Sequence, residues 1–112
     1  MTDLLQEKNS LVRQLSASVK KLRETGTDYA EKERDYKVLV SQECIRLRGE
    51  GMAVSMINLV IYGLPNVAQA RFERDVALTI YEANKEAINS LKLKLRLIEG
   101  QMSREWNSGN EV

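Results

Sequence analysis

The chain has 112 residues, of which 43% are hydrophobic and 29% are charged, and its formal net charge is +1. This length predicts one domain, and the near-neutral charge gives no global preference for nucleic acid or another polyanion. A single cysteine excludes an intramolecular disulfide, and the absence of histidine excludes Ser-His-Asp, Cys-His and His-metal chemistry. We therefore expect no enzymatic activity, no cofactor and no metal.

The first predicted helix covers residues 3–48. Apolar residues recur every three or four positions from Leu4 to Leu47, which is the spacing of one helical face. Gly26 interrupts this rhythm, so the helix either breaks there or continues through a weak point that costs about 1 kcal/mol relative to alanine. A hairpin whose arms match in length favours the continuous helix. Gly49 and Gly51 mark its end.

Residues 49–65 form an apolar connector that is nearly free of charge. Its β-branched residues are compatible with a short strand, but we favour a helical turn that Ser55 caps and Gly63 ends. The connector is either buried, in the protein's own core or in an oligomer, or it is exposed as a docking surface. In each case we expect it to contact a partner of some kind. The candidate contact residues are Met52, Met56, Ile57, Leu59, Val60, Ile61 and Tyr62.

The second predicted helix covers residues 66–107 and is about 60 Å long. Its apolar residues are spaced by three or four and are assigned to one face, the predicted seam. They are Ala68, Phe72, Val76, Ile80, Ala83, Ala87, Leu91, Leu95, Ile98, Met102 and Trp106. Because no compact domain of this size covers such a rod, a partner is expected along it. Residues 108–112 are predicted to be a frayed tail.

These elements predict an all-α fold with one domain over residues 1–107. Two long antiparallel helices form a hairpin, a short apolar connector joins them, and the seam drives association into a homo-oligomer, a dimer or higher. We expect a cytoplasmic protein without a membrane-spanning segment, because the longest apolar run is far shorter than the roughly 20 residues that span a bilayer.

The predicted hairpin brings two basic clusters together. With the turn at residues 49–65, facing positions in the two arms have numbers that add to about 114. Near the open end this pairing joins six cations, which are Lys20, Lys21, Arg23, Lys92, Lys94 and Arg96. Such clusters bind DNA or RNA by neutralising phosphates, and the alternative is a solvated helical surface without a ligand.

Several stretches of the chain resemble small helical proteins encoded by phages and prophages of Gram-positive bacteria. The resemblance is carried by residues 47–51, 61–63, 67–68, 71–75, 81–83, 87–92 and 104–106. It implies a place among early phage genes concerned with replication, recombination or host take-over, and hence the cytoplasm of a host cell. The architecture also looks like the helical-hairpin host-nuclease inhibitors of the Gam type.

Three hypotheses about function follow. The first is a non-catalytic phage-type accessory or inhibitor protein that binds a host protein, such as a nuclease or a defence component. The second is a nucleic-acid-binding accessory of phage recombination or replication. The third is a structural or assembly protein.

Overall fold

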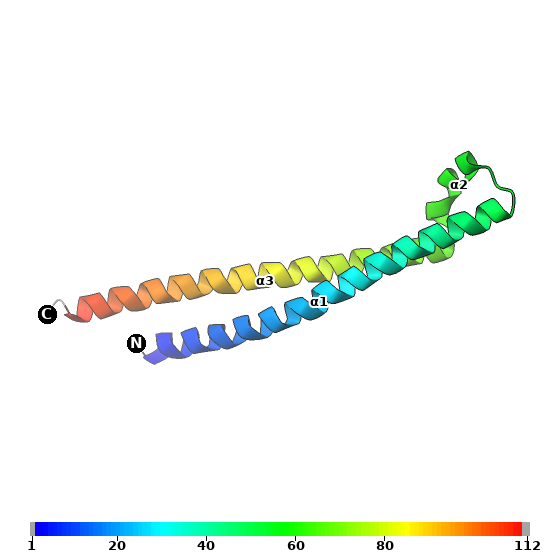
Figure 1. Cartoon of the computed structure of the whole chain (residues 1–112). Coiled ribbons are helices and arrows are strands. Elements are labelled where there is room, and N and C mark those ends of the chain that lie inside the picture. Colours follow the sequence, from blue (N-terminus) through cyan, green and yellow to red (C-terminus); the bar gives the residue numbers. More distant parts are fainter. Residues whose placement is uncertain (1, 111–112) are drawn as a thin grey trace. The chain divides into compact units, whose positions relative to one another are not determined.

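A computed structural model describes residues 2–110 of the chain (Figure 1). Its elements are α1 (Thr2–Gly49), α2 (Val54–Val60), a 3-10 helix η1 (Ile61–Gly63) and α3 (Pro65–Asn110). Residues 2–110 contain no strand, so the predicted all-α fold with a long N-terminal and a long C-terminal helix is confirmed. Helix α3 continues three residues beyond its predicted end, and residues 111 and 112 of the predicted tail lie outside the described part.

The chain divides into two compact units, each of which contains a segment of α1 and a segment of α3. Unit 1 comprises residues 1–24 and 82–112, and unit 2 comprises residues 25–81, including α2 and η1. Each unit has its own cluster of buried apolar side chains. Leu11, Leu91 and Ile98 form the cluster of unit 1, and Tyr36, Leu47, Ile57, Ile61 and Val67 form that of unit 2.

Helix α1 runs through Gly26 without a break. The reason for glycine at this position lies in unit 2, where the Tyr81 ring packs against it. A Cβ atom added to Gly26 would lie 3.1 Å from Cε1 of Tyr81. The Tyr81 ring also stacks on Tyr29, with 6.2 Å between the ring centroids. Gly26 therefore makes room for an aromatic ring in the packing between the helices and does not end the helix.

This contact makes a specific prediction for Gly26→Ala. Alanine gains up to about 1 kcal/mol of helix propensity over glycine, but its Cβ must displace the Tyr81 ring by a few tenths of an ångström. We expect little net change in the free energy of unfolding in the wild-type background and a gain of about 1 kcal/mol in a Tyr81→Ala background. Urea denaturation of the four proteins measures this difference. An equal gain in both backgrounds would show that the ring does not constrain Gly26.

Within each unit the α1 and α3 segments bury a seam whose positions alternate in steps of three and four. In unit 2 the α3 side of this seam consists of Val67, Ala70, Arg74, Ala77 and Tyr81, and in unit 1 it consists of Asn84, Ile88, Leu91, Leu95, Ile98 and Met102. Such alternation averages 3.5 residues per step and is the repeat by which two helices pack along their length.

The predicted seam of α3 is wrong in its first half. Its ten steps from Ala68 to Trp106 cover 38 residues. At about 100° per residue, this distance leaves a rotation of about 200° beyond whole turns, so the predicted series winds to nearly the opposite side of the helix. Its exposed members are Ala68, Phe72, Val76, Ile80, Ala83, Ala87 and Trp106, and its remaining members, Leu91, Leu95, Ile98 and Met102, lie in the seam.

Polar residues take seam positions because their polar groups find partners. In unit 2 the Arg74 guanidinium lies 4.5 Å from the centroid of the Tyr36 ring and 3.6 Å from a carboxylate oxygen of Glu33. In unit 1 the buried Asn84 side chain donates a hydrogen bond of 3.1 Å to the backbone carbonyl of Ser18. Satisfied groups of this kind avoid the penalty for burying an unpaired polar atom. In unit 2 the bulkier Phe72, Val76 and Ile80 are left outside the seam.

The helices pair in a different register from the predicted one. Within unit 2, contacting residues such as Glu33 and Arg74, or Glu43 and Asn66, have numbers that add to 107 and 109 rather than about 114. The cause is the connector, because α2 and η1 pack on the end of α1 through Leu47. Helix α3 therefore starts beside Glu43 and not beside the last residue of α1.

Candidate partner-binding surfaces

The connector begins with a glycine-dependent helix end. Gly51 has a φ of +91°, its N–H donates to the carbonyl of Arg48, and the N–H of Met52 donates to the carbonyl of Leu47. This pair of bonds is the Schellman motif, in which a left-handed glycine satisfies the last carbonyls of a helix. Met52 then packs against the buried cluster that contains Leu47. The chain is thereby turned back toward α1.

Two isoleucines hold the connector on unit 2. Ile57 in α2 and Ile61 in η1 are four residues apart on one side, and they are 3% and 2% exposed. They belong to the same buried cluster as Val67 at the start of α3. The predicted helical turn is confirmed, but α2 begins at Val54 with Ala53 at the cap position and no side-chain cap bond, so Ser55 is not its cap.

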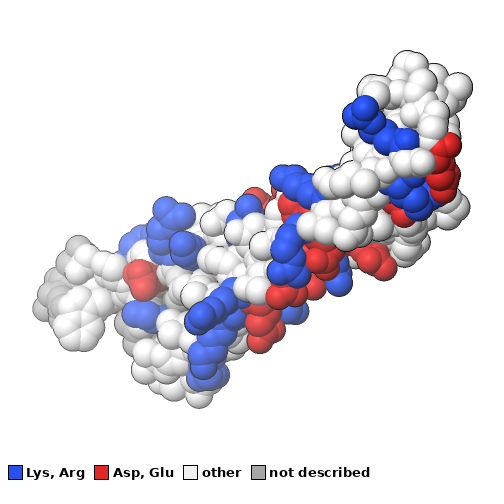
Figure 2. Space-filling model, turned by 45° about the vertical axis from the view of Figure 1, so that its right-hand side comes forward, with Lys and Arg blue, Asp and Glu red and all other residues white. Residues whose placement is uncertain are grey.

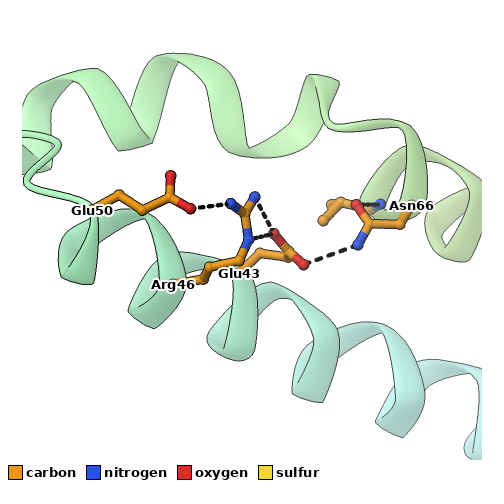
Figure 3. A network of polar contacts seen from close by, with 5 residues as sticks. Glu43, Arg46, Glu50 and Asn66 are labelled. Atoms are coloured by element: carbon orange, nitrogen blue, oxygen red, sulfur yellow. Dashed lines mark hydrogen bonds and ion pairs between the residues drawn. The ribbon is translucent and has the colours of Figure 1, made fainter.

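A polar network fixes the first turn of α3 beside α1 in unit 2 (Figure 3). The Glu43 carboxylate accepts hydrogen bonds from Arg46 at 2.8 Å and from Asn66 at 3.0 Å, and Arg46 also bonds to Glu50 at 2.8 Å. These bonds, first that from Arg46, lower the pKa of Glu43 below its ordinary value. Their stabilising effect is therefore present above the ordinary pKa and is lost as the pH falls through the lowered one.

The opposite side of the connector is an exposed apolar patch, which we call the connector patch. Leu59 is 80% exposed, and Val54, Met56 and Tyr62 are each about half exposed. Of the seven predicted contact residues, Met56, Leu59 and Tyr62 lie in this patch. Met52 and Val60 are half-buried against the core, and Ile57 and Ile61 are buried in it. Val54 also belongs to the patch, although it was not among the predicted contact residues.

The connector patch lies in an uncharged stretch of the chain, and a hollow lies beside it. Residues 51–70 include no charged side chain. Beside Tyr62 lies a shallow hollow of about 410 Å³, which Tyr36, Val40 and Ser41 line together with Lys37. Helix α1 supplies all of these lining residues except Tyr62. The patch can therefore receive an apolar side chain of a partner at its edge.

A second exposed apolar surface lies on α3 within unit 2 and is called the α3 stripe. It consists of Phe72, Val76 and Ile80, which are spaced by four residues and are 62%, 40% and 49% exposed. They line a shallow groove of about 260 Å³ with Ala77, Asp28, Lys32 and Glu73. This surface contains three members of the predicted seam, and within unit 2 no segment covers it.

The six predicted basic residues all lie in unit 1 and are all exposed. They do not meet as predicted, because contacts in this unit join Lys8 to Glu99 and Ser18 to Asn84, positions whose numbers add to 107 and 102. Residues 92–96 are therefore level with residues 6–15 of α1. The α1 cations at positions 20–23 lie at least five residues, or about 8 Å, further along.

Among residues 2–110, no group of three or more acidic or cysteine side chains is placed to hold a metal ion. The thiol of Cys44 is half-buried against the core of unit 2. Neither long helix has, within this range, an apolar stretch of the length and hydropathy that crosses a bilayer.

Comparison of the chain with protein-family models, with curated proteins and with solved structures finds no match.

Proposed function

We propose that this protein is a non-catalytic accessory protein that acts by binding another protein through the connector patch. The observation that carries the proposal is the position of Leu59, which is 80% exposed on a short helix whose other side is buried. A side chain of this size and exposure contributes nothing to the stability of unit 2. Its transfer from water into an interface is favourable by about 25 cal/mol for each Å² of apolar surface.

The construction of the patch favours specific binding. Contiguous exposed apolar side chains rimmed by polar ones are typical of protein–protein interaction sites. Tyr62 is of a residue type enriched at binding hot spots, and Met56 adapts its shape to a partner. Because Ile57 and Ile61 fix the backbone of α2 and η1, little conformational entropy is lost when a partner binds.

The resemblance to phage proteins suggests the kind of partner. A phage-type accessory or inhibitor would bind a host protein, such as a nuclease or a defence component, and block or redirect it by occupancy alone. This role needs no catalytic group and no cofactor. A host cytoplasm is the compartment that this role implies.

We further propose that the protein self-associates through the α3 stripe and not through the seam, which is already occupied within each unit. The stripe suits a second copy because its spacing by four residues matches the ridges along which helices pack. Asp28 and Glu73 on the groove wall lie beside Lys32, so one groove carries both charge signs. A two-fold pairing can therefore place each sign opposite its complement.

Capture from the lysate of a Gram-positive host, with quantitative mass spectrometry, tests the connector patch. The bait proteins are the wild type, Leu59→Asp and the control Leu93→Asp, which makes the same substitution at a leucine that is 52% exposed and lies in unit 1. We expect one host protein to be enriched by the wild type and by the control, and at least tenfold less by Leu59→Asp. If all three baits with intact helix content enrich the same proteins equally, the patch is not the binding site.

A further inference from the structure

Unit 1 contains two helical stretches that carry cations without any anion. Residues 9–23 of α1 and residues 87–98 of α3 include no aspartate or glutamate. Their seven cations are Arg13, Lys20, Lys21, Arg23, Lys92, Lys94 and Arg96. Arg13 was not among the predicted residues, but it is level with Lys94 in the observed register. These two stretches, each about 20 Å long, are together called the band.

These seven side chains are exposed, and among residues 2–110 none of them makes an ion pair. In unit 2, four cations are paired with carboxylates. Arg34, Lys37, Arg46 and Arg74 are each within 3.3 Å of a carboxylate oxygen. In Figure 2 blue and red side chains alternate over much of the surface, whereas the part nearest the chain termini, which belongs to unit 1, shows blue with little red. Among the described residues, cations without an ion pair are thus more numerous on unit 1 than on unit 2, and they point to an anionic ligand.

The extended form of the band selects the ligand class. A pocket would concentrate cations on one small anion, but these cations follow the two helices over a length of roughly six base-pair steps of 3.4 Å. Hydroxyl and amide groups that donate to phosphates accompany them, and Gln14, Ser18 and Ser90 line a shallow hollow of about 450 Å³ beside Lys94.

The composition of the band also indicates which nucleic-acid structure it suits. Neither residues 9–23 nor residues 87–98 include an aromatic side chain. Proteins that hold single strands stack the bases on aromatic rings, and such stacking is absent from these two stretches. Contacts to the sugar–phosphate backbone alone are sequence-independent and suit a duplex.

We propose that unit 1 binds the sugar–phosphate backbone of a nucleic-acid duplex through this band, without reading base sequence. Lys92 and Arg96, four residues apart and on one side of α3, contact one strand. Arg13 and Lys20 lie on the side of α1 that points away from its seam residues Leu11 and Leu15, and they add positive charge to the surface that attracts the duplex. This binding is independent of the connector patch, which lies in unit 2, so loss of one activity leaves the other testable.

Fluorescence anisotropy with a labelled 20-base-pair DNA duplex, measured between 50 and 200 mM salt, tests the proposal. We expect binding at 50 mM salt that weakens with a log–log slope of about −3 to −4, the value for roughly four neutralised phosphates. Lys92→Glu with Arg96→Glu should weaken binding at least tenfold and make the slope shallower by about 2. Changing the base sequence of the duplex should alter the affinity less than threefold.

A charge-matched control separates the band from net charge. Arg48→Glu with Arg71→Glu changes the net charge by the same amount at two exposed positions of unit 2, and we expect this variant to bind the duplex within about threefold of the wild type. Equal weakening by both variants, or no binding of the wild type at 50 mM salt, would overturn the proposal. Tighter binding to vesicles containing phosphatidylserine than to the duplex would overturn the proposal in favour of a membrane surface. Circular dichroism spectra of both variants that match the wild type would show that loss of folding is not the cause of weaker binding.

Discussion

Leu91→Asp is expected to unfold unit 1. Leu91 is 8% exposed and packs with Leu11 and Ile98 in the buried cluster of this unit. Truncation of a buried leucine costs about 2–5 kcal/mol, and an aspartate must in addition bury a carboxylate or shift its pKa. The described part of unit 1 consists of two helical segments, and Leu91 belongs to the one buried cluster found there. The loss of about 4 kcal/mol is a large fraction of the stability of a small protein.

The matched control is Leu93→Asp, two residues along the same helix at a position that is 52% exposed. The same substitution there should change the free energy of unfolding by less than about 1 kcal/mol, because no buried contact is lost. Thermal unfolding followed by circular dichroism distinguishes the two variants. If both variants melt at the same temperature, the assignment of the seam in unit 1 is incorrect.

Ile57→Asp is expected to release the connector from unit 2. Ile57 is buried with Leu47 and Val67, and these three residues join α2 to both long helices within the unit. A carboxylate at this position removes the apolar contact and leaves a charge in the core, for which we expect a loss of about 3–4 kcal/mol. The α2 helix has only seven residues and no side-chain cap, so it does not persist once the anchor is lost.

Leu59→Asp is the natural comparison, since the same substitution two residues further along α2 falls on the exposed side. Hydrogen exchange read by mass spectrometry should show fast exchange over residues 52–64 in Ile57→Asp and wild-type exchange in Leu59→Asp. Protection of residues 52–64 in both variants would mean that Ile57 does not anchor the connector.

The class of fold was predictable because it depends on long-range periodicity. Steps of three and four from Leu4 to Leu47 are sufficient to indicate a long helix, and glycine near residue 50 is sufficient to end it. The meaning of Gly26 was not predictable in the same way. Its role depends on Tyr81, which is distant in sequence and comes near only when the segments of unit 2 pack.

The side of α3 that packs was predictable only where the seam is apolar. From Leu91 to Met102 the predicted positions and the seam coincide, so the prediction is confirmed there. In unit 2 the seam contains Arg74 and two alanines, whereas the bulkier Phe72 lies outside it. Hydrophobicity alone favours the wrong side, because Arg74 finds Glu33 and the Tyr36 ring on α1 in addition to its neighbour Asp75.

The connector posed a different difficulty, because a short helix gives too few residues for its buried side to be assigned from spacing. Ile57 and Leu59 are similar in size and type, yet one is buried and the other exposed. The neighbouring core on α1 and α3 decides between them. The basic residues were recognised individually, but their arrangement was not, since paired residues within unit 1 have numbers that add to 102–107 rather than about 114.

We propose that α3 packs on two sides. One side packs against α1 within each unit, and the other, the α3 stripe, packs against a second copy of the protein. The measurement that tests it most directly is the solution mass of the wild type and of Ile80→Asp by light scattering over a range of concentrations. We expect the wild type to be a dimer or larger oligomer. We expect Ile80→Asp to be a monomer of unchanged helix content, because Ile80 is exposed and lies outside both buried clusters. A monomeric wild type at every concentration, or a variant with the mass of the wild type, would contradict it.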